Sequence, residues 1–169
     1  FGRLQAQSIR STEAFLAEAH AFVDRSAGRV RALVPFDPDS NLVCLAINPR
    51  GNDDPRVMNR FMRRLHKRLS ADAEKPLQLG EYFGSITTLK PDALGPLETQ
   101  RILAALGFPA DALIEGDEEC DRIVVLRHTL MHPFLLDQGH GSSYLSGYFD
   151  FLERQIEQLL ATDDGASNA

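Results

Sequence analysis

The stretch DRIVVLRHTLMHP, residues 121–133, decides the fold of this chain. Four apolar residues, Ile123 to Leu126, run directly into Arg127. An apolar, β-branched run bounded by polar residues predicts a buried strand. An arginine at the end of such a strand is expected where a sheet meets a cavity or an interface. We also expect an anionic partner for it, because desolvating an unpaired guanidinium costs several kcal/mol.

The segments around this strand alternate between strand-like and helical patterns. Residues 31–36 and 42–47 are apolar runs joined by the turn cluster DPDSN, which predicts a β-hairpin. The first strand is expected at an edge, because Pro35 cannot donate to a ladder. Apolar residues at helical spacing predict further helices. The remaining expected elements are a helix from an N-cap at Ser11 to about Asp24, a helix from Pro55 to about Ser70, a strand at 82–89, a helix at 96–106 and a helix at about 144–161. Asp54 is expected to cap the second of these helices, Gly107 to end the one at 96–106, and GHGSS (139–143) to form a flexible joint.

Together these elements predict an α+β domain. A small antiparallel or mixed sheet of about four strands would have one face covered by the amphipathic helices. We expect residues 1–28 to connect from a preceding large domain, 29–161 to form the α+β domain, and 162–169 to be a disordered tail. The chain begins with Phe1 rather than methionine, so we expect it to be part of a longer polypeptide.

Composition excludes some classes of function. The 169 residues are 43% hydrophobic and 25% charged, which is typical of one globular core. The formal net charge of −6 argues against a nucleic-acid binder. No apolar run approaches the length of a membrane span. Two cysteines, Cys44 and Cys120, cannot form a disulfide framework, which favours a reducing, cytoplasmic compartment.

One predicted helix nevertheless has a strongly basic face. This pattern leaves a nucleic-acid module as a third hypothesis, beside the plainer interpretation of a solvated or inter-domain surface. The basic residues of that face are Arg56, Arg60, Arg63, Arg64 and Lys67.

Arg127 is the main candidate for a binding residue, because a guanidinium can hold a carboxylate through two parallel hydrogen bonds. The alternative is an internal salt bridge to a carboxylate of residues 115–121. His128 and His132 are four residues apart, which in a strand separates them by about 13 Å, so no shared metal is expected. His140 is either a ligand-facing residue or part of a linker. The chain contains no Walker, HExxH, GxSxG or GxGxxG motif.

Three stretches carry a resemblance to a known family. VPFDPDSNLVCLAINP (34–49) resembles the strand that opens the small C-terminal domain of group II pyridoxal-5′-phosphate-dependent amino-acid decarboxylases. YFGSITTL (82–89) and LRHTLMHP (126–133) are similar to later elements of that domain. The branch of tyrosine, aspartate or glutamate decarboxylases is the most similar one. Two departures, Leu45 for phenylalanine and His132 for asparagine, leave the substrate open.

The resemblance implies a role for this chain in a larger enzyme. The family's cofactor, pyridoxal 5′-phosphate, would be bound by a large domain of the same polypeptide, and the enzyme would be a homodimer. Arg127 would bind the substrate carboxylate, with His128 and His132 as further candidates. A related aminotransferase or lyase is a close variant. For this enzyme we expect no nucleic-acid or membrane partner. The alternative from another class is a non-catalytic module that binds a carboxylate metabolite through Arg127.

Overall fold

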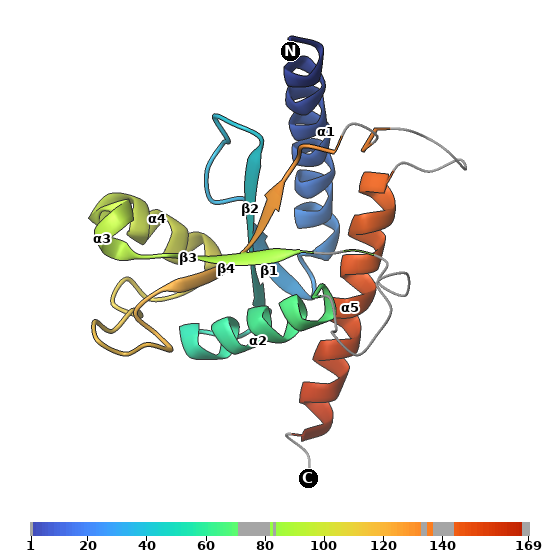
Figure 1. Cartoon of the computed structure of the whole chain (residues 1–169). Coiled ribbons are helices and arrows are strands. Elements are labelled where there is room, and N and C mark those ends of the chain that lie inside the picture. Colours follow the sequence, from blue (N-terminus) through green and yellow to red (C-terminus); the bar gives the residue numbers. More distant parts are fainter. Residues whose placement is uncertain (1, 71–81, 83, 133–134, 137–143, 167–169) are drawn as a thin grey trace.

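Among the described residues, four strands form one antiparallel sheet in the order β1-β2-β4-β3 (Figure 1). The computed structural model describes residues 2–70, 82, 84–132, 135–136 and 144–166. The strands are β1 (Val30–Leu33), β2 (Leu42–Pro49), β3 (Ser85–Leu89) and β4 (Ile123–Thr129). The helices are α1 (Gly2–Ser26), α2 (Pro55–Arg68), α3 (Pro91–Leu94), α4 (Pro96–Leu106) and α5 (Tyr144–Ala166). The predicted α+β class is confirmed, with β1 at an edge as expected.

The strand that contains Arg127 lies inside the sheet. β4 pairs with β2 on one side and with β3 on the other. Ile123 to Leu126 are all buried, as a continuous apolar run requires of a strand covered on both faces. β4 continues to Thr129, so Arg127 lies within the strand, whereas the sequence predicted it at the strand's end. Its paired neighbours are Cys44 of β2 and Ser85 of β3.

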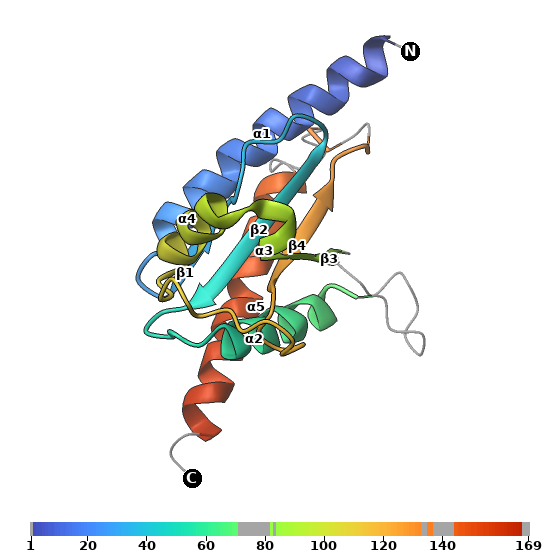
Figure 2. The same cartoon turned by 90° about the vertical axis from the view of Figure 1, so that its left-hand side faces the viewer.

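Helices cover both faces of the sheet, whereas the sequence predicted one. Figure 2 shows α3 and α4 in front of β2, with α5 behind it. Arg31 and Asn48 are paired neighbours in β1 and β2, and both donate to the carbonyl of Leu106 at the end of α4. α4 therefore packs on the β1–β2 part of its face. On the same face, Arg127 and Thr129 remain exposed.

Local signals placed the ends of two helices correctly. At the start of α2, Asp54 Oδ1 accepts a hydrogen bond from the N–H of Arg56 at 2.8 Å, and Pro55 is the first helical residue. α4 ends at Gly107, whose φ of 82° is left-handed and favours glycine. A Cβ at this position would also collide with the guanidinium of Arg31.

The first and last helices are longer than predicted. Ser11, expected as an N-cap, lies inside α1, and its buried hydroxyl has no partner among the described residues. α5 continues to Ala166, beyond the end predicted at about residue 161. Thr162 accepts from Arg64 of α2 at 3.1 Å, which holds this turn of α5 against α2. Residues 167–169 and the flexible joint predicted at 139–143 lie outside the described residues. None of the described helices is long and apolar enough to cross a membrane.

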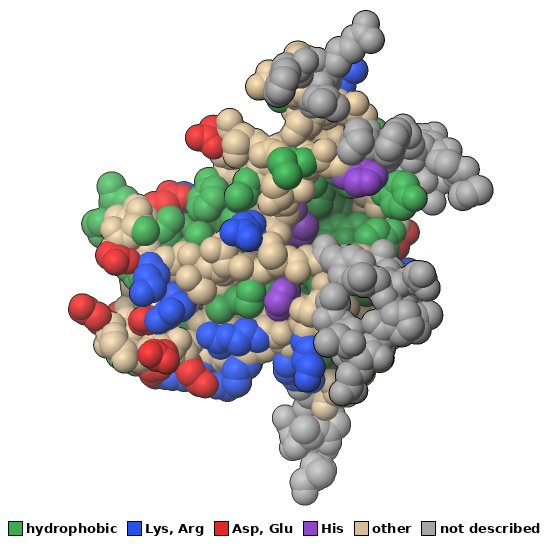
Figure 3. Space-filling view, viewed as in Figure 1, with side chains coloured by type: hydrophobic (Ala, Val, Ile, Leu, Met, Phe, Trp, Pro, Cys, Tyr) green, Lys and Arg blue, Asp and Glu red, His purple; other side chains and the backbone are tan. Residues whose placement is uncertain are grey.

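The basic face of α2 is partly neutralised within the chain. Arg56 Nε donates to Asp117 at 3.1 Å, and Arg60 pairs with Glu119 at 3.2 Å. Figure 3 shows blue and red side chains intermingled over this part of the surface. The acidic residues of the loop before β4 thus pair with α2, which favours a solvated face over a nucleic-acid interface.

Candidate functional site

A cleft of about 360 Å³ lies where β4 extends past the start of β3. β3 begins at Ser85, opposite Arg127, so His128 and Thr129 have no β3 partner among the described residues. α1, the segment before β3, β4 and α5 all contribute to the lining. The aromatic residues that line the cleft are Phe15, Tyr82, Tyr144 and Tyr148.

The cleft brings together the three residues that the sequence singled out. Arg127, His128 and His132 all line it. Arg127 and His128 are neighbours on β4 and therefore project from opposite faces of the sheet. They border one cleft because none of the described residues before Ser85 pairs with the last residues of β4. His132 follows the strand and is exposed. His140 lies outside the described residues.

Arg127 is exposed, and none of the described carboxylates forms an ion pair with it. No carboxylate of residues 115–121 pairs with it, because those of Asp117, Glu119 and Asp121 pair with arginines other than Arg127. In the part of the chain that the structure describes, its side chain makes one hydrogen bond, from Nε to Ser85 Oγ at 3.3 Å. The expectation of an internal salt bridge is therefore wrong for these residues. The expectation that burial would demand an anion also fails, because the guanidinium is in contact with solvent.

His128 is fixed between the sheet and α5. Its Nδ1 lies 3.2 Å from the carbonyl of Val43, and its Nε2 lies 2.6 Å from the hydroxyl of Tyr148. A carbonyl only accepts, so Nδ1 must carry the proton and Tyr148 must donate to Nε2. Burial lowers the pKa of His128 to about 4, which keeps the imidazole neutral. The ring of Phe15 lies against it at 4.6 Å between centroids.

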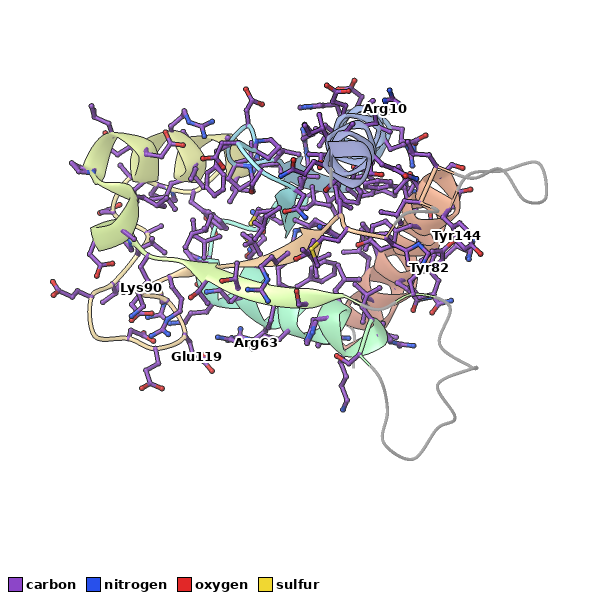
Figure 4. The ribbon with its side chains drawn as sticks, turned by 45° about the horizontal axis from the view of Figure 1, so that its top comes forward. Arg10, Arg63, Tyr82, Lys90, Glu119 and Tyr144 are labelled. Carbon is purple, nitrogen blue, oxygen red and sulfur yellow. The ribbon has the colours of Figure 1, made fainter. Side chains whose placement is uncertain are left out.

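The tyrosines of the cleft were not among the candidate site residues predicted from the sequence. The chain has three tyrosines, and all of them line it. Figure 4 shows Tyr82 and Tyr144 on the same side of the molecule, whereas Lys90 and Glu119 lie at the other end of the sheet. Tyr144 and Tyr148 are four residues apart on α5, a spacing that places both on one helix face and could have indicated them. No comparable sequence signal marks Tyr82.

Tyr82 is held by a close approach to α5. Its ring packs edge-on against Tyr148 at 5.5 Å between centroids. Its hydroxyl lies over Gly147, where an added Cβ would come within 2.6 Å of it. The absence of a side chain at Gly147 thus lets Tyr82 lie across the helix and close one side of the cleft.

The polar groups of the site do not form a metal centre. No group of three or more His, Cys, Asp or Glu residues that could hold a metal ion occurs among the described residues. Cys44 lies beside Arg127 in the sheet but is buried, and burial raises the pKa of its thiol, although the Arg127 guanidinium acts in the opposite direction. The arrangement therefore offers one exposed cation, a neutral histidine and aromatic walls, which suit the binding of an anionic group attached to an apolar body.

Comparison with known proteins places most of the chain in one family. The family model described as "Tyrosine decarboxylase, C-terminal" matches residues 9–158. No match was found among the curated proteins. The matched span includes all four strands and every residue of the cleft named above.

Proposed function

Because the chain belongs to the tyrosine decarboxylase C-terminal family, we propose that Arg127 binds the substrate carboxylate in a pyridoxal-phosphate-dependent amino-acid decarboxylase. The observation that carries this proposal is the position of Arg127. Its guanidinium is exposed beside an aromatic cleft and has no carboxylate partner among the described residues. A planar cation in such a place can hold a carboxylate through two parallel hydrogen bonds.

The aromatic walls support an amino acid with a ring as its side chain. The ring of Tyr148 packs against Tyr82 at 5.5 Å and against Phe15 at 6.1 Å between centroids. Aromatic surfaces of this kind bind a further ring by edge-on or offset contacts. A ligand ring bound there would displace water from the cleft, which would strengthen an ion pair formed at its edge. The carboxylate would lie at Arg127 and the ring against the exposed faces of the aromatic walls.

The residues described here do not fit the cofactor itself. Pyridoxal phosphate is held on a lysine, and none of the described residues that line the cleft is a lysine. Lys67 and Lys90 are exposed, on α2 and directly before α3. We therefore assign the cofactor, which supplies the electron sink for loss of carbon dioxide, to a large domain of the same polypeptide. This chain would bind and orient the substrate.

The test of this proposal is the kinetics of an Arg127→Ala variant of the full-length polypeptide. Loss of a charged, two-pronged hydrogen bond costs about 1.5–3 kcal/mol, so kcat/KM for L-tyrosine should fall about 10- to 100-fold. The cofactor's absorbance should not change, because Arg127 is not expected to contact it.

The matched control is Arg63→Ala, which removes the same side chain from the exposed face of α2 (Figure 4). Arg63 does not line the cleft, so kcat/KM should stay at the wild-type value. Wild-type kinetics in the Arg127→Ala variant would contradict the proposal.

A second candidate function is a module that binds a carboxylate without catalysis. It is favoured by the observation that Arg127 and the aromatic walls all lie within this chain. The chain has no tryptophan and its three tyrosines line the cleft, so tyrosine fluorescence reports on this site alone. L-phenylalanine does not fluoresce at tyrosine wavelengths, and phenethylamine differs from it only in lacking the carboxylate. If this chain alone binds L-phenylalanine more tightly than phenethylamine, the module interpretation gains support.

The proposal extends to assembly and compartment. We expect a homodimer of the full-length polypeptide in the cytoplasm, which ultracentrifugation and cell fractionation would test. Both cysteines are free and buried, which is compatible with a reducing compartment. A related aminotransferase or lyase reaction is the close variant, and product analysis after incubation with L-tyrosine distinguishes it from decarboxylation.

A further inference from the structure

We propose that Ser85 is a positioning residue that fixes the orientation of Arg127 at the cleft. The inference deepens the proposed function and rests on it, because it concerns how the carboxylate-binding arginine is held. Ser85 is the first residue of β3 and pairs directly with Arg127 of β4. Both side chains also line the cleft.

Two reciprocal hydrogen bonds join these residues. Arg127 Nε donates to Ser85 Oγ at 3.3 Å, and Ser85 Oγ donates to the backbone carbonyl of Arg127 at 2.9 Å. A hydroxyl has one proton, so donating it to the carbonyl leaves only lone pairs for the guanidinium. The hydroxyl is thus oriented by the strand backbone and acts as an acceptor for Nε.

This contact determines which edge of the guanidinium is free. An arginine can bind a carboxylate through Nε and one terminal nitrogen, or through its two terminal nitrogens. Ser85 occupies Nε, and neither terminal nitrogen of Arg127 has a partner among the residues that the structure describes. The pair Nη1 and Nη2 is therefore the edge left for a ligand. A ligand carboxylate would bind end-on.

Ser85 can act in this way because Tyr82 and Gly84, which precede it, are held in place by contacts with α5 and with the end of α2. The N–H of Gly84 donates to the carbonyl of Leu69 at 2.9 Å, and a Cβ at Gly84 would come within 3.2 Å of the Leu69 side chain. Two residues earlier, Tyr82 lies across Gly147 of α5. The backbone that carries Ser85 is thereby anchored to both α2's end and α5.

On its other side, Arg127 is bordered by a small residue. Its pairing partner in β2 is Cys44, whose side chain is buried beneath the surface. A small neighbour on each side leaves room for the arginine to stand out from the sheet. Of these two neighbours, only Ser85 makes a hydrogen bond to the guanidinium among the described contacts.

The kinetic test uses the Ser85→Ala variant of the full-length polypeptide with L-tyrosine as substrate. Without the acceptor, Arg127 samples more rotamers, so KM should rise about 3- to 10-fold while kcat stays unchanged. Ser85→Thr keeps the hydroxyl and suits a strand, and it should restore the wild-type KM. The control is Thr87→Ala, which removes a hydroxyl from the same face of β3 two residues further along.

A double-mutant cycle separates positioning from a merely structural role. If Ser85 acts through Arg127, adding Ser85→Ala to Arg127→Ala should cause no further rise in KM. Additive effects of the two substitutions would overturn the inference. A wild-type KM in Ser85→Ala together with a raised KM in Arg127→Ala would also overturn the inference about Ser85. That result would leave the proposed function of Arg127 intact. If neither substitution changes KM, the proposed function fails.

A second measurement does not depend on catalysis. In NMR spectra of this chain, the Nε–H proton of Arg127 should exchange with water faster in Ser85→Ala than in wild type, and Ser85→Thr should reverse the change. Equal exchange rates in wild type and Ser85→Ala would show that the hydroxyl does not hold the guanidinium, and would overturn the inference.

Discussion

At the scale of single residues, His128 shows how neighbours set the state of a side chain. Nδ1 donates to the Val43 carbonyl, and Nε2 accepts from Tyr148. Burial disfavours the charged imidazolium and lowers the pKa to about 4. Burial likewise raises the pKa of Tyr148 above its usual range, so this phenol stays a donor at neutral pH. The pair is a neutral support for one wall of the cleft.

The pKa of His128 predicts a pH-dependent stability. In the unfolded chain the histidine binds a proton near pH 6.5, whereas in the folded chain it does so near pH 4. Between these values the unfolded state binds more protons, so the free energy of unfolding should fall as the pH drops. The loss should reach about 3 kcal/mol by pH 4. Urea unfolding at several pH values measures it.

Substitution of the histidine isolates this effect from that of the carboxylates. His128→Gln should flatten the fall in the free energy of unfolding between pH 6.5 and pH 4 relative to wild type. His20→Gln, at an exposed position of α1, should leave the wild-type curve unchanged. An equal slope in His128→Gln and wild type would contradict the buried neutral histidine.

Arg127 shows what a residue pattern can and cannot reveal. The sequence indicated the residue, because an arginine interrupts an apolar strand. It could not reveal the exposure of the side chain, since this depends on α3 and α4 covering only part of the sheet face. Its partner Ser85 comes from a strand more than 40 positions away, and strand pairing of this kind leaves no local trace.

At the scale of elements, helix ends were predictable where a local cap determines them. Asp54 before Pro55 and Gly107 after α4 are such signals, and both are confirmed. The ends of α1 and α5 depend instead on contacts between distant residues. Arg25 in the last turn of α1 and Arg29 just after this helix pair with Glu153 of α5, and so join the two helices. Pairs of this kind cannot be identified from one segment at a time.

The cap of α2 predicts the result of a substitution. Asp54→Ala removes the acceptor of the Arg56 N–H at 2.8 Å and should lower the free energy of unfolding by about 1 kcal/mol. Asp53→Ala removes a carboxylate from the exposed neighbouring position and should change it little. Chemical denaturation of the three proteins measures both values. Equal losses in the two variants would exclude a specific cap.

At the scale of the whole molecule, the sheet lies between two layers of helices. α1, α2 and α5 cover one face, and α3 and α4 cover part of the other (Figure 2). The sequence predicted the amphipathic helices but assigned them to one face. Their distribution depends on the crossover between β3 and β4, in which α3 and α4 precede the return to the middle of the sheet. Periodicity within a helix does not specify which face it covers.

Because the helices and the sheet contribute to one hydrophobic core, we expect the domain to unfold cooperatively. The hydrophobic cluster is continuous from Phe15 of α1 through β2 and β4 to Phe149 of α5. Tyrosine fluorescence reports on the cleft, because all three tyrosines line it, whereas far-ultraviolet circular dichroism reports on the helices. The two signals should show the same urea midpoint. A cleft transition at lower urea would show that the cleft unfolds separately from the core.

The proposed role of Arg127 as a carboxylate-binding residue is tested most directly by two ligands that differ only in the carboxylate. L-tyrosine has this group and tyramine lacks it. In the full-length polypeptide, Arg127→Ala should raise the KM for L-tyrosine about tenfold or more and leave the inhibition constant of tyramine unchanged. If both constants change equally, or neither changes, Arg127 does not bind the substrate carboxylate.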